Sequence, residues 1–220
     1  MAATALSWFV YVPVHEMLHA AGCGITGGEA REIEIAPLYG GRWLEKWIPR
    51  VRSGGDHAGR LTSFRTRGSD LRYLATDAAP YILSVLAVPL LRLATRRRRI
   101  LIGAMALVPA LAPFLGLAGD YYEMGSVLVT RAASPGAPAP EPGEEPPGLM
   151  RIRTDDPIAL LGRLEAGPSG TLDGFPGGLP GSVAAMALAG LTGMVLAFLT
   201  YGLGDLLGRW WVPPASTPPR

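Results

Sequence analysis

The sequence predicts an all-α membrane protein with about four transmembrane helices and a short β-hairpin-like segment after the first helix. Hydrophobic residues make up 49% of the 220 residues and charged residues only 17%, whereas a soluble globular domain usually carries about 25% charged residues. The charges lie in patches that are separated by long apolar stretches. This composition excludes a disordered chain and disfavours a soluble enzyme.

Four stretches approach the length of about 20 mostly apolar residues that a helix needs to cross a bilayer. They lie at residues 3–23, 74–94, 100–129 and 182–208. His15, Glu16 and His19 are the polar interruptions of the first stretch. No basic residue precedes that stretch, so we expect a retained spanning helix rather than a cleaved secretory signal.

The spans divide the chain into four parts. We expect a membrane-embedded core at 1–130, a Pro/Gly-rich extramembrane loop at 131–181, the fourth helix at 182–208 and a tail at 209–220. The loop contains a short helical segment at 158–165. The positive-inside rule does not select one orientation, because the arginines at 96–99 and the arginine-rich loop 25–72 fall on opposite sides.

Loop 25–72 carries the strand signal. Apolar and charged residues alternate from Ala30 to Ala36, which is the period of a half-buried strand. Glycine pairs at 27–28 and 40–41 supply turns, so we expect a short hairpin. Trp43 and Trp47 indicate a short helix at the membrane interface.

Charge and cysteine content exclude three further classes. The net charge of +2 is too small for a nucleic-acid binder that uses a broad basic face. A single cysteine, Cys23, rules out a disulfide framework within the chain and a cysteine-rich zinc module. The sequence also contains no Asn and no Gln, so amide side chains carry no function here.

The first span contains an H-E-x-x-H motif formed by His15, Glu16 and His19. On a helix, histidines at i and i+4 lie on one face and can each offer a nitrogen to Zn²⁺ at about 2.0–2.1 Å. Glu16 is placed to act as the general base toward a water molecule. Ionisable groups inside a spanning helix are costly, which favours a functional role for all three.

With this motif in its first span, the chain resembles the site-2 protease family of intramembrane zinc metalloproteases. A Gly-rich β-like segment follows at 27–41, and Asp77-Ala78-Ala79-Pro80 is similar in place to the family's Gly-Pro helix start. The resemblance implies a third zinc ligand, an Asp in a later span, usually in a Leu-Asp-Gly context preceded by an Asn and prolines. This chain departs from the family because it has no Asn and because its Leu-Asp-Gly lies outside the spans.

Three acids compete to be the third zinc ligand. Asp120 follows two prolines late in the third span, which runs parallel to the first if each segment crosses once, so it reaches the depth of the histidines. Glu123 lies one turn further on and could be a ligand or an outer-shell group. Asp173 matches the family's tripeptide best, but it lies in a loop before a span antiparallel to the first. We prefer Asp120 over Glu123 and Asp173.

Other polar residues have weaker claims. Asp77 could line the site or lie at the membrane interface, and Cys23, at i+4 from His19, could extend the metal face or simply pack. We expect His57 to be solvated and Asp205 to be interfacial. Tyr121 and Tyr122 are interfacial anchors or donors to an oxyanion.

Together these features predict a zinc-dependent endopeptidase that hydrolyses peptide bonds of membrane-embedded or membrane-proximal substrates. Its cofactor is Zn²⁺, and its partners are a membrane protein or peptide substrate and the lipid bilayer, with no nucleic acid. The protein is expected to be a multi-pass protein of a bacterial-type cell membrane. The β-like segment would pair with an unwound substrate by strand addition. The alternatives are a non-catalytic metal-binding protein, such as a degenerate protease homologue, and a metal transporter.

Overall fold

The computed structural model describes residues 1–137, 148–166 and 177–211 and is mostly helical. In chain order the elements are α1 (Ala2–Ile25), β1 (Glu29–Ile35), η1 (Pro37–Tyr39), α2 (Gly41–Leu44), β2 (Val51–Ser53), β3 (Gly59–Arg65), α3 (Asp70–Ala78), η2 (Ala79–Tyr81), α4 (Ile82–Arg96), α5 (Ile100–Leu115), α6 (Asp120–Ala133), η3 (Gly148–Ile152), α7 (Pro157–Ala166) and α8 (Gly178–Trp211).

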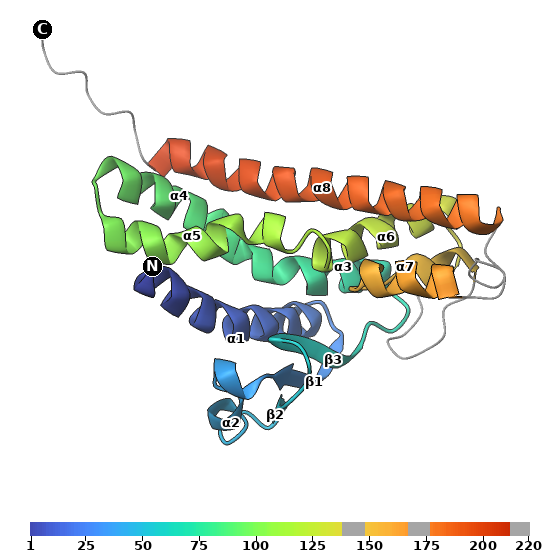
Figure 1. Cartoon of the computed structure of the whole chain (residues 1–220), viewed down its shortest axis with the longest axis horizontal. Coiled ribbons are helices and arrows are strands. Elements are labelled where there is room, and N and C mark those ends of the chain that lie inside the picture. The colour runs from blue at the N-terminus through green and yellow to red at the C-terminus, as the bar shows by residue number, and fades with distance from the viewer. Residues whose placement is uncertain (138–147, 167–176, 212–220) are drawn as a thin grey trace, which may run out of the picture.

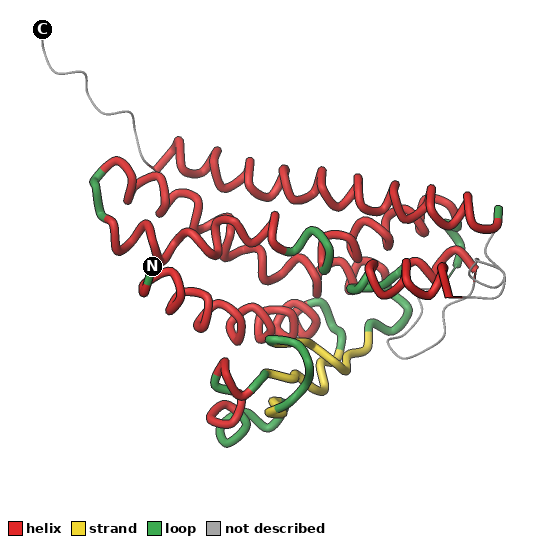
Figure 2. Tube along the Cα trace, in the orientation of Figure 1, coloured by secondary structure: helices red, strands yellow, loops and turns green. Residues whose placement is uncertain are grey.

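The elements stack in layers (Figure 1). α8 covers one side of the bundle, α3–α4 and α5–α6 form the middle, and α1 lies beneath them with the sheet packed below it. α1 and α5–α6 run in one direction, whereas α3–α4 and α8 run in the other (Figure 1). The strands are confined to one side of the molecule, below the helices and beside the C-terminal half of α1 (Figure 2).

Within the described part of the chain, three helical stretches are long and apolar enough to cross a membrane: Asp70–Arg96, Ile100–Ala133 and Gly178–Trp211. The first predicted span, α1, is 24 residues long, but it falls outside this set because the side chains of His15, Glu16 and His19 lower its hydropathy. The expected count of about four spans is therefore not confirmed.

The strand predicted at Ala30–Ala36 is confirmed as β1, but the expected simple hairpin is wrong. β1 is the middle strand of a three-stranded sheet, parallel to β2 and antiparallel to β3. The Gly40–Gly41 pair leads into the short helix α2 instead of a returning strand, and this detour lets β2 pair in parallel. Trp43 is 63% exposed and Trp47 is 71% exposed around this helix.

Close backbone contact joins α8 to α6. A Cβ added at Gly193 would lie 2.2 Å from the carbonyl oxygen of Tyr121, and one added at Gly125 would lie 2.1 Å from the carbonyl oxygen of Ala189. Ala189 and Gly193 are four residues apart, the small-xxx-small spacing that lets membrane helices approach closely. This contact sets the position of α6 in the bundle.

Part of the predicted extramembrane loop belongs to the same packed body. Ile152 of η3 and Leu160 and Leu164 of α7 are buried against Tyr122 of α6 and Met186 of α8. The helix expected at 158–165 is confirmed as α7. An ion pair of 2.8 Å between Arg153 and Asp70 also ties η3 to α3.

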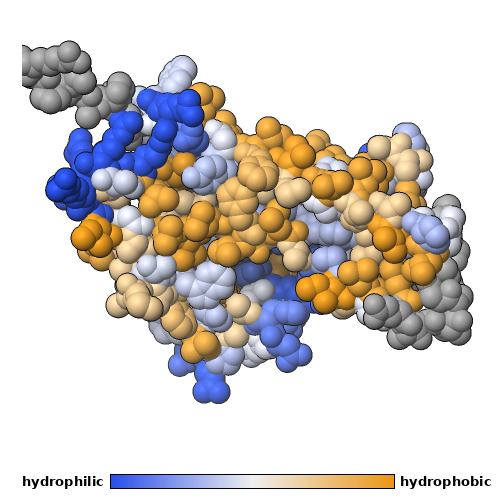
Figure 3. Space-filling model, turned by 45° about the horizontal axis from the view of Figure 1, so that its top comes forward, coloured by the Kyte–Doolittle hydropathy of each residue, from blue (hydrophilic) through white to orange (hydrophobic). Residues whose placement is uncertain are grey.

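Much of the face shown in Figure 3 is apolar, which suits a hydrocarbon environment. A strongly hydrophilic cap covers the end of the bundle at the α4–α5 turn, where the sequence has arginines at 96–99 (Figure 3). A second hydrophilic region lies near the sheet, in a recess of this face (Figure 3). On this face the most hydrophilic surface is therefore concentrated in these two regions.

The α6–α8 contact gives a test of the packing. We expect Gly193→Leu to destabilise the protein by about 2–3 kcal/mol, because the added side chain forces the two backbones apart. Gly190→Leu is the matched control, since a Cβ at Gly190 meets nothing within 4 Å. Thermal unfolding in detergent measures the difference, and equal melting temperatures for the two variants would contradict the packing described.

Candidate metal centre

α1 presents two faces to two different neighbours. Met17 and Ala20 pack against the buried core of the sheet, while His15 and His19 point toward α6 and α3 on the other side. The helical period produces this division, because residues at i and i+4 share a face and the positions between them do not. His19 is 7% exposed and Glu16 is 8% exposed.

Asp120 reaches the histidines because the third span is broken. α5 ends at Leu115, and α6 begins at Asp120 after the segment Gly116–Gly119. A Cβ at Gly116 would lie 2.1 Å from the hydroxyl oxygen of Tyr81, so the absence of a side chain there makes room for Tyr81. As the first residue of α6, Asp120 also lies at the helix end whose dipole stabilises a negative charge.

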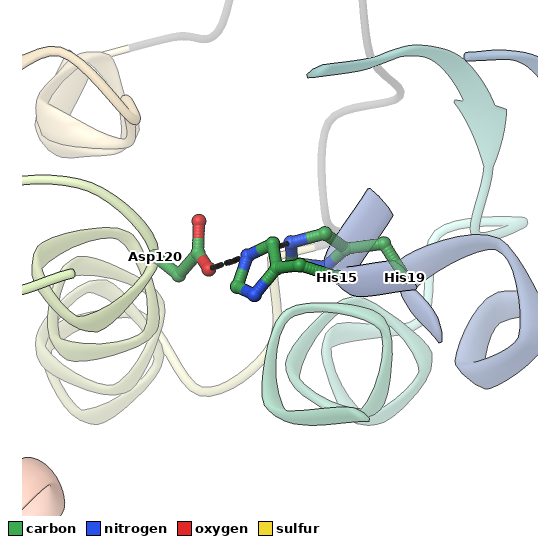
Figure 4. A group of neighbouring side chains, drawn as sticks. All are labelled: His15, His19 and Asp120. Atoms are coloured by element: carbon green, nitrogen blue, oxygen red, sulfur yellow. Dashed lines mark hydrogen bonds and ion pairs between the residues drawn. The ribbon is translucent and has the colours of Figure 1, made fainter. Parts of the chain in front are cut away.

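Two imidazoles and one carboxylate converge on a single point (Figure 4). The Nε2 atom of His15 lies 3.1 Å from that of His19, and 3.1 Å from Oδ2 of Asp120. Nε2 of His19 lies 3.3 Å from the same oxygen. Among the described residues, this is the group of His, Cys, Asp and Glu side chains whose arrangement could hold a metal ion.

Each of the three groups is oriented by an outer partner. Nδ1 of His19 donates to the carbonyl oxygen of Thr76 at 2.8 Å, and the Tyr81 hydroxyl donates to Oδ2 of Asp120 at 2.9 Å. The Tyr11 hydroxyl lies 2.8 Å from Nδ1 of His15. Partners of this kind fix the tautomer and ring orientation of histidines that bind metals.

The hydrogen bond to Thr76 determines which ring nitrogen of His19 carries a proton. A carbonyl oxygen only accepts, so Nδ1 of His19 carries a proton, and Nε2 of the neutral ring presents its lone pair. That lone pair faces the Asp120 carboxylate at 3.3 Å, an arrangement that repels unless a cation lies between the two atoms. A proton or a metal ion at this point removes the repulsion.

The spacing of the three atoms fits zinc. In a tetrahedral site with bonds of about 2.0–2.1 Å, neighbouring ligand atoms are about 3.3 Å apart. The three observed separations are 3.1, 3.1 and 3.3 Å. Two imidazole nitrogens and one carboxylate oxygen are also a donor set that catalytic zinc uses, with the fourth position left for water or substrate.

Glu16 lies beside this group, under the third strand. Its carboxylate accepts a hydrogen bond from the backbone of Leu61, and a Cβ at Gly59 would lie 2.5 Å from its Cγ. Glu16, His19 and Asp120 together line a cavity of about 100 Å³. Glu16 therefore lines the same cavity as His19 and Asp120, which belong to the metal group.

The outer edge of β3 faces this cavity. The N–H group of Ile33 donates to the carbonyl oxygen of Arg50, and the carbonyl oxygen of Ile35 accepts from the N–H group of Gly54. Both residues of β1 therefore turn their backbone groups toward the β2 side. Their partners Leu61 and Gly59 thus form non-hydrogen-bonded pairs with β1, and their backbone groups point away from it. The Leu61 group that reaches Glu16 is on this outer edge.

The competing acids occupy other places. Glu123 accepts a hydrogen bond from the Tyr73 hydroxyl and lines the cavity without joining the three convergent atoms. Asp77, expected either here or at an interface, also lines the cavity and is 5% exposed. Asp173 lies outside the described residues. Asp120 is thus the acid placed against both histidines, and metal binding there stays a prediction.

The remaining candidates lie away from the metal group. Cys23 is buried, with its Sγ 3.9 Å from the carbonyl oxygen of Arg65, and His57 is exposed as expected. Asp205 pairs with two arginines of the α4 and α8 ends. The oxyanion role considered for Tyr121 and Tyr122 is disfavoured: the Tyr121 hydroxyl donates to Thr200 at 2.8 Å, and Tyr122 packs against α7.

Sequence reasoning missed the three outer partners. Tyr11 had a usable signal, because it precedes His15 by four residues and so shares its helix face. Tyr81 and Thr76 had none, because their positions depend on how α3 and η2 pack against α1. The tyrosines nearest the metal group are thus Tyr11 and Tyr81 rather than the adjacent pair at the start of α6.

We expect the purified protein to bind about one Zn²⁺ per chain, because the three donor atoms match the spacing of zinc ligands. Replacing both histidines, His15→Ala/His19→Ala, or replacing the carboxylate, Asp120→Ala, should remove the metal. Two imidazoles alone hold zinc weakly. Elemental analysis of the protein in detergent measures the bound metal.

Asp205→Ala is the control for this experiment. Asp205 also lies in a long helix, and its ion pairs among the described residues are with arginines. This variant should keep its zinc. Folded wild-type protein without zinc, or Asp120→Ala protein with full zinc content, would refute the assignment.

Comparisons with protein-family models, with curated proteins and with solved structures found no match to this chain. Its function is therefore argued from the convergence of His15, His19 and Asp120 and from the position of Glu16 beside them.

Proposed function

We propose that this chain is an intramembrane zinc metalloprotease of the site-2 protease type, a multi-pass protein of a bacterial-type cell membrane. The observation that carries the proposal is the convergence of His15, His19 and Asp120 at 3.1–3.3 Å beside the buried acid Glu16. His15, His19 and Asp120 would hold the zinc ion. When bound, zinc supplies Lewis-acid chemistry, because it polarises the scissile carbonyl and acidifies water.

Glu16 performs the proton transfers in this proposal. Its carboxylate accepts a proton from the water that attacks the scissile carbonyl carbon, and then delivers that proton to the leaving amine nitrogen. The hydrogen bond from Leu61 and the contact with Gly59 restrict the carboxylate to one position. Such restriction matters because a misplacement of about 1 Å can cost on the order of 100-fold in rate.

The substrate is an extended peptide in this proposal. A helix must unwind before its backbone can reach Glu16. The outward-facing groups of Gly59 and the carbonyl group of Leu61 then offer hydrogen bonds to it by strand addition, while the Leu61 N–H group stays with Glu16. The sequence has no Asn, so recognition of the substrate backbone falls to this edge of β3.

Two other functions have less support. A transporter requires ligands along a path across the membrane, and among the described residues one group could hold a metal ion. A non-catalytic metal-binding protein has no use for a buried acid beside the metal group, and burying Glu16 without such a use is expensive. The intact Glu16 thus favours an enzyme.

Glu16→Gln separates an enzyme from a metal-binding scaffold. We expect the substitution to abolish cleavage of a membrane substrate, since glutamine cannot accept the proton, while zinc stays bound because Glu16 is not a ligand. Parallel proteolysis and elemental analysis measure the two effects. Undiminished cleavage by the variant would show that the active centre is elsewhere.

Gly59→Ala tests the contact between β3 and Glu16. The new methyl group would displace the Glu16 side chain, so we expect activity to fall about 10–100-fold with zinc retained. Gly54→Ala is the matched control in the same sheet region, because a Cβ at Gly54 meets nothing within 4 Å. Equal activity of both variants and the wild type would disprove the positioning role of β3.

A further inference from the structure

The cavity beside the metal group contains more acids than the proposed reaction uses. Five carboxylates line it, and they belong to Glu16, Asp77, Asp120, Glu123 and Asp155. Asp120 is assigned to the metal and Glu16 to proton transfer. Asp155 pairs with Arg60 at 2.8 Å, which leaves Asp77 and Glu123 without a cationic partner among the described residues.

Asp77 is the most isolated of these acids. Its side chain lines the cavity and is 5% exposed, and its Oδ2 atom has no hydrogen-bond partner among the described residues. Glu123, Asp120 and Asp155 all repel a charge on it. Keeping such a group ionised without a partner costs several kcal/mol or more. The buried carboxyl group therefore either keeps its proton or pairs with a ligand that brings positive charge.

The described residues do not supply that charge. Arg60 is the one lysine or arginine among the described residues that line the cavity, and its guanidinium is engaged by Asp155 at the exposed side, where the two side chains are 45% and 34% exposed. The Glu123 carboxylate accepts a hydrogen bond from the Tyr73 hydroxyl. Among the described residues, the inner part of the cavity is therefore lined by carboxyl groups without a cation, and Arg60 lies at its mouth.

We propose that this cavity is a subsite for a basic side chain of the substrate, recognised by Asp77 and Glu123; the proposal rests on the peptidase function proposed above. Its volume of about 100 Å³ exceeds what one water molecule needs and can admit the ammonium end of a lysine. His19 and Asp120 line the same cavity, so the basic residue would stand next to the bond that is cleaved.

The edge of β3 supports this placement. Gly59, Arg60 and Leu61 form one wall of the cavity, and side chains of an added strand would alternate between the two sides of the sheet. A substrate strand on this edge would thus direct every second side chain to the cavity side. The basic side chain would enter there, while its neighbours remain outside.

The test uses two tripeptide hydroxamates that differ only in lysine against norleucine at the residue that bears the hydroxamate. Both can bind zinc, and only one carries a positive charge. Their affinities are measured for the zinc-loaded full chain in detergent, and for Asp77→Asn, Glu123→Gln and the control Asp205→Asn. Glu123→Gln keeps the test valid if Asp77→Asn does not fold.

We expect wild type and Asp205→Asn to prefer the lysine compound by at least about tenfold, because charged partners in a buried site bind more strongly. The preference should fall to within about twofold in Asp77→Asn and in Glu123→Gln. Equal affinity of wild type for both compounds would overturn the subsite and leave the peptidase proposal intact, since both compounds still bind the metal.

A metal-free arm separates the two proposals. Thermal unfolding of the chelator-treated protein is compared with n-butylammonium and with 1-butanol. If neither hydroxamate binds, the peptidase proposal fails, and stabilisation by n-butylammonium in wild type but not in Asp77→Asn still supports a cation site. If neither hydroxamate binds and n-butylammonium also leaves the melting temperature unchanged, the subsite proposal is overturned as well.

Discussion

The structure depends on placing two imidazoles and a carboxylate against one another inside a helical bundle. Their three reactive atoms lie 3.1–3.3 Å apart, and the proton on Nδ1 of His19 directs a lone pair at the Asp120 oxygen. A proton or a metal ion at this point makes the arrangement stable. The hydroxyl groups of Tyr11 and Tyr81 and the carbonyl of Thr76 each contact one of the three groups.

The surrounding helices hold this arrangement from several sides. α1 carries both histidines and rests on the sheet, while α6 carries Asp120 and is packed against α8 through glycines that leave no room for a side chain. The break at Gly116–Gly119 lets α6 begin at the level of the histidines. A rigid centre inside the bundle is thus built from elements far apart in the sequence.

The acids around the cavity divide into different roles by their contacts. Asp120 touches both histidines, Glu16 touches the edge of β3, Asp155 pairs with Arg60, and Glu123 accepts from a tyrosine. Asp77 has a buried oxygen with no such contact in the described part of the chain. In a medium of low dielectric constant these contacts give each carboxyl group a different environment, on which the proposed roles of metal ligand, proton carrier and partner of a positive charge rest.

The sequence by itself determined the features that depend on local periodicity: the long apolar helices, the strand at Glu29–Ile35, and the histidines at i and i+4 with Glu16 between them. The sequence favoured Asp120 over Glu123 by depth, and the tertiary structure places Asp120 against the histidines. Tertiary structure alone decided that β3 lies over Glu16 and that Asp77 lines the cavity. The parallel pairing of β2 and the break before α6 belong with these. The physical reason is that a residue's helix face follows from its neighbours in sequence, whereas the partner of that face follows from how helices distant in sequence pack.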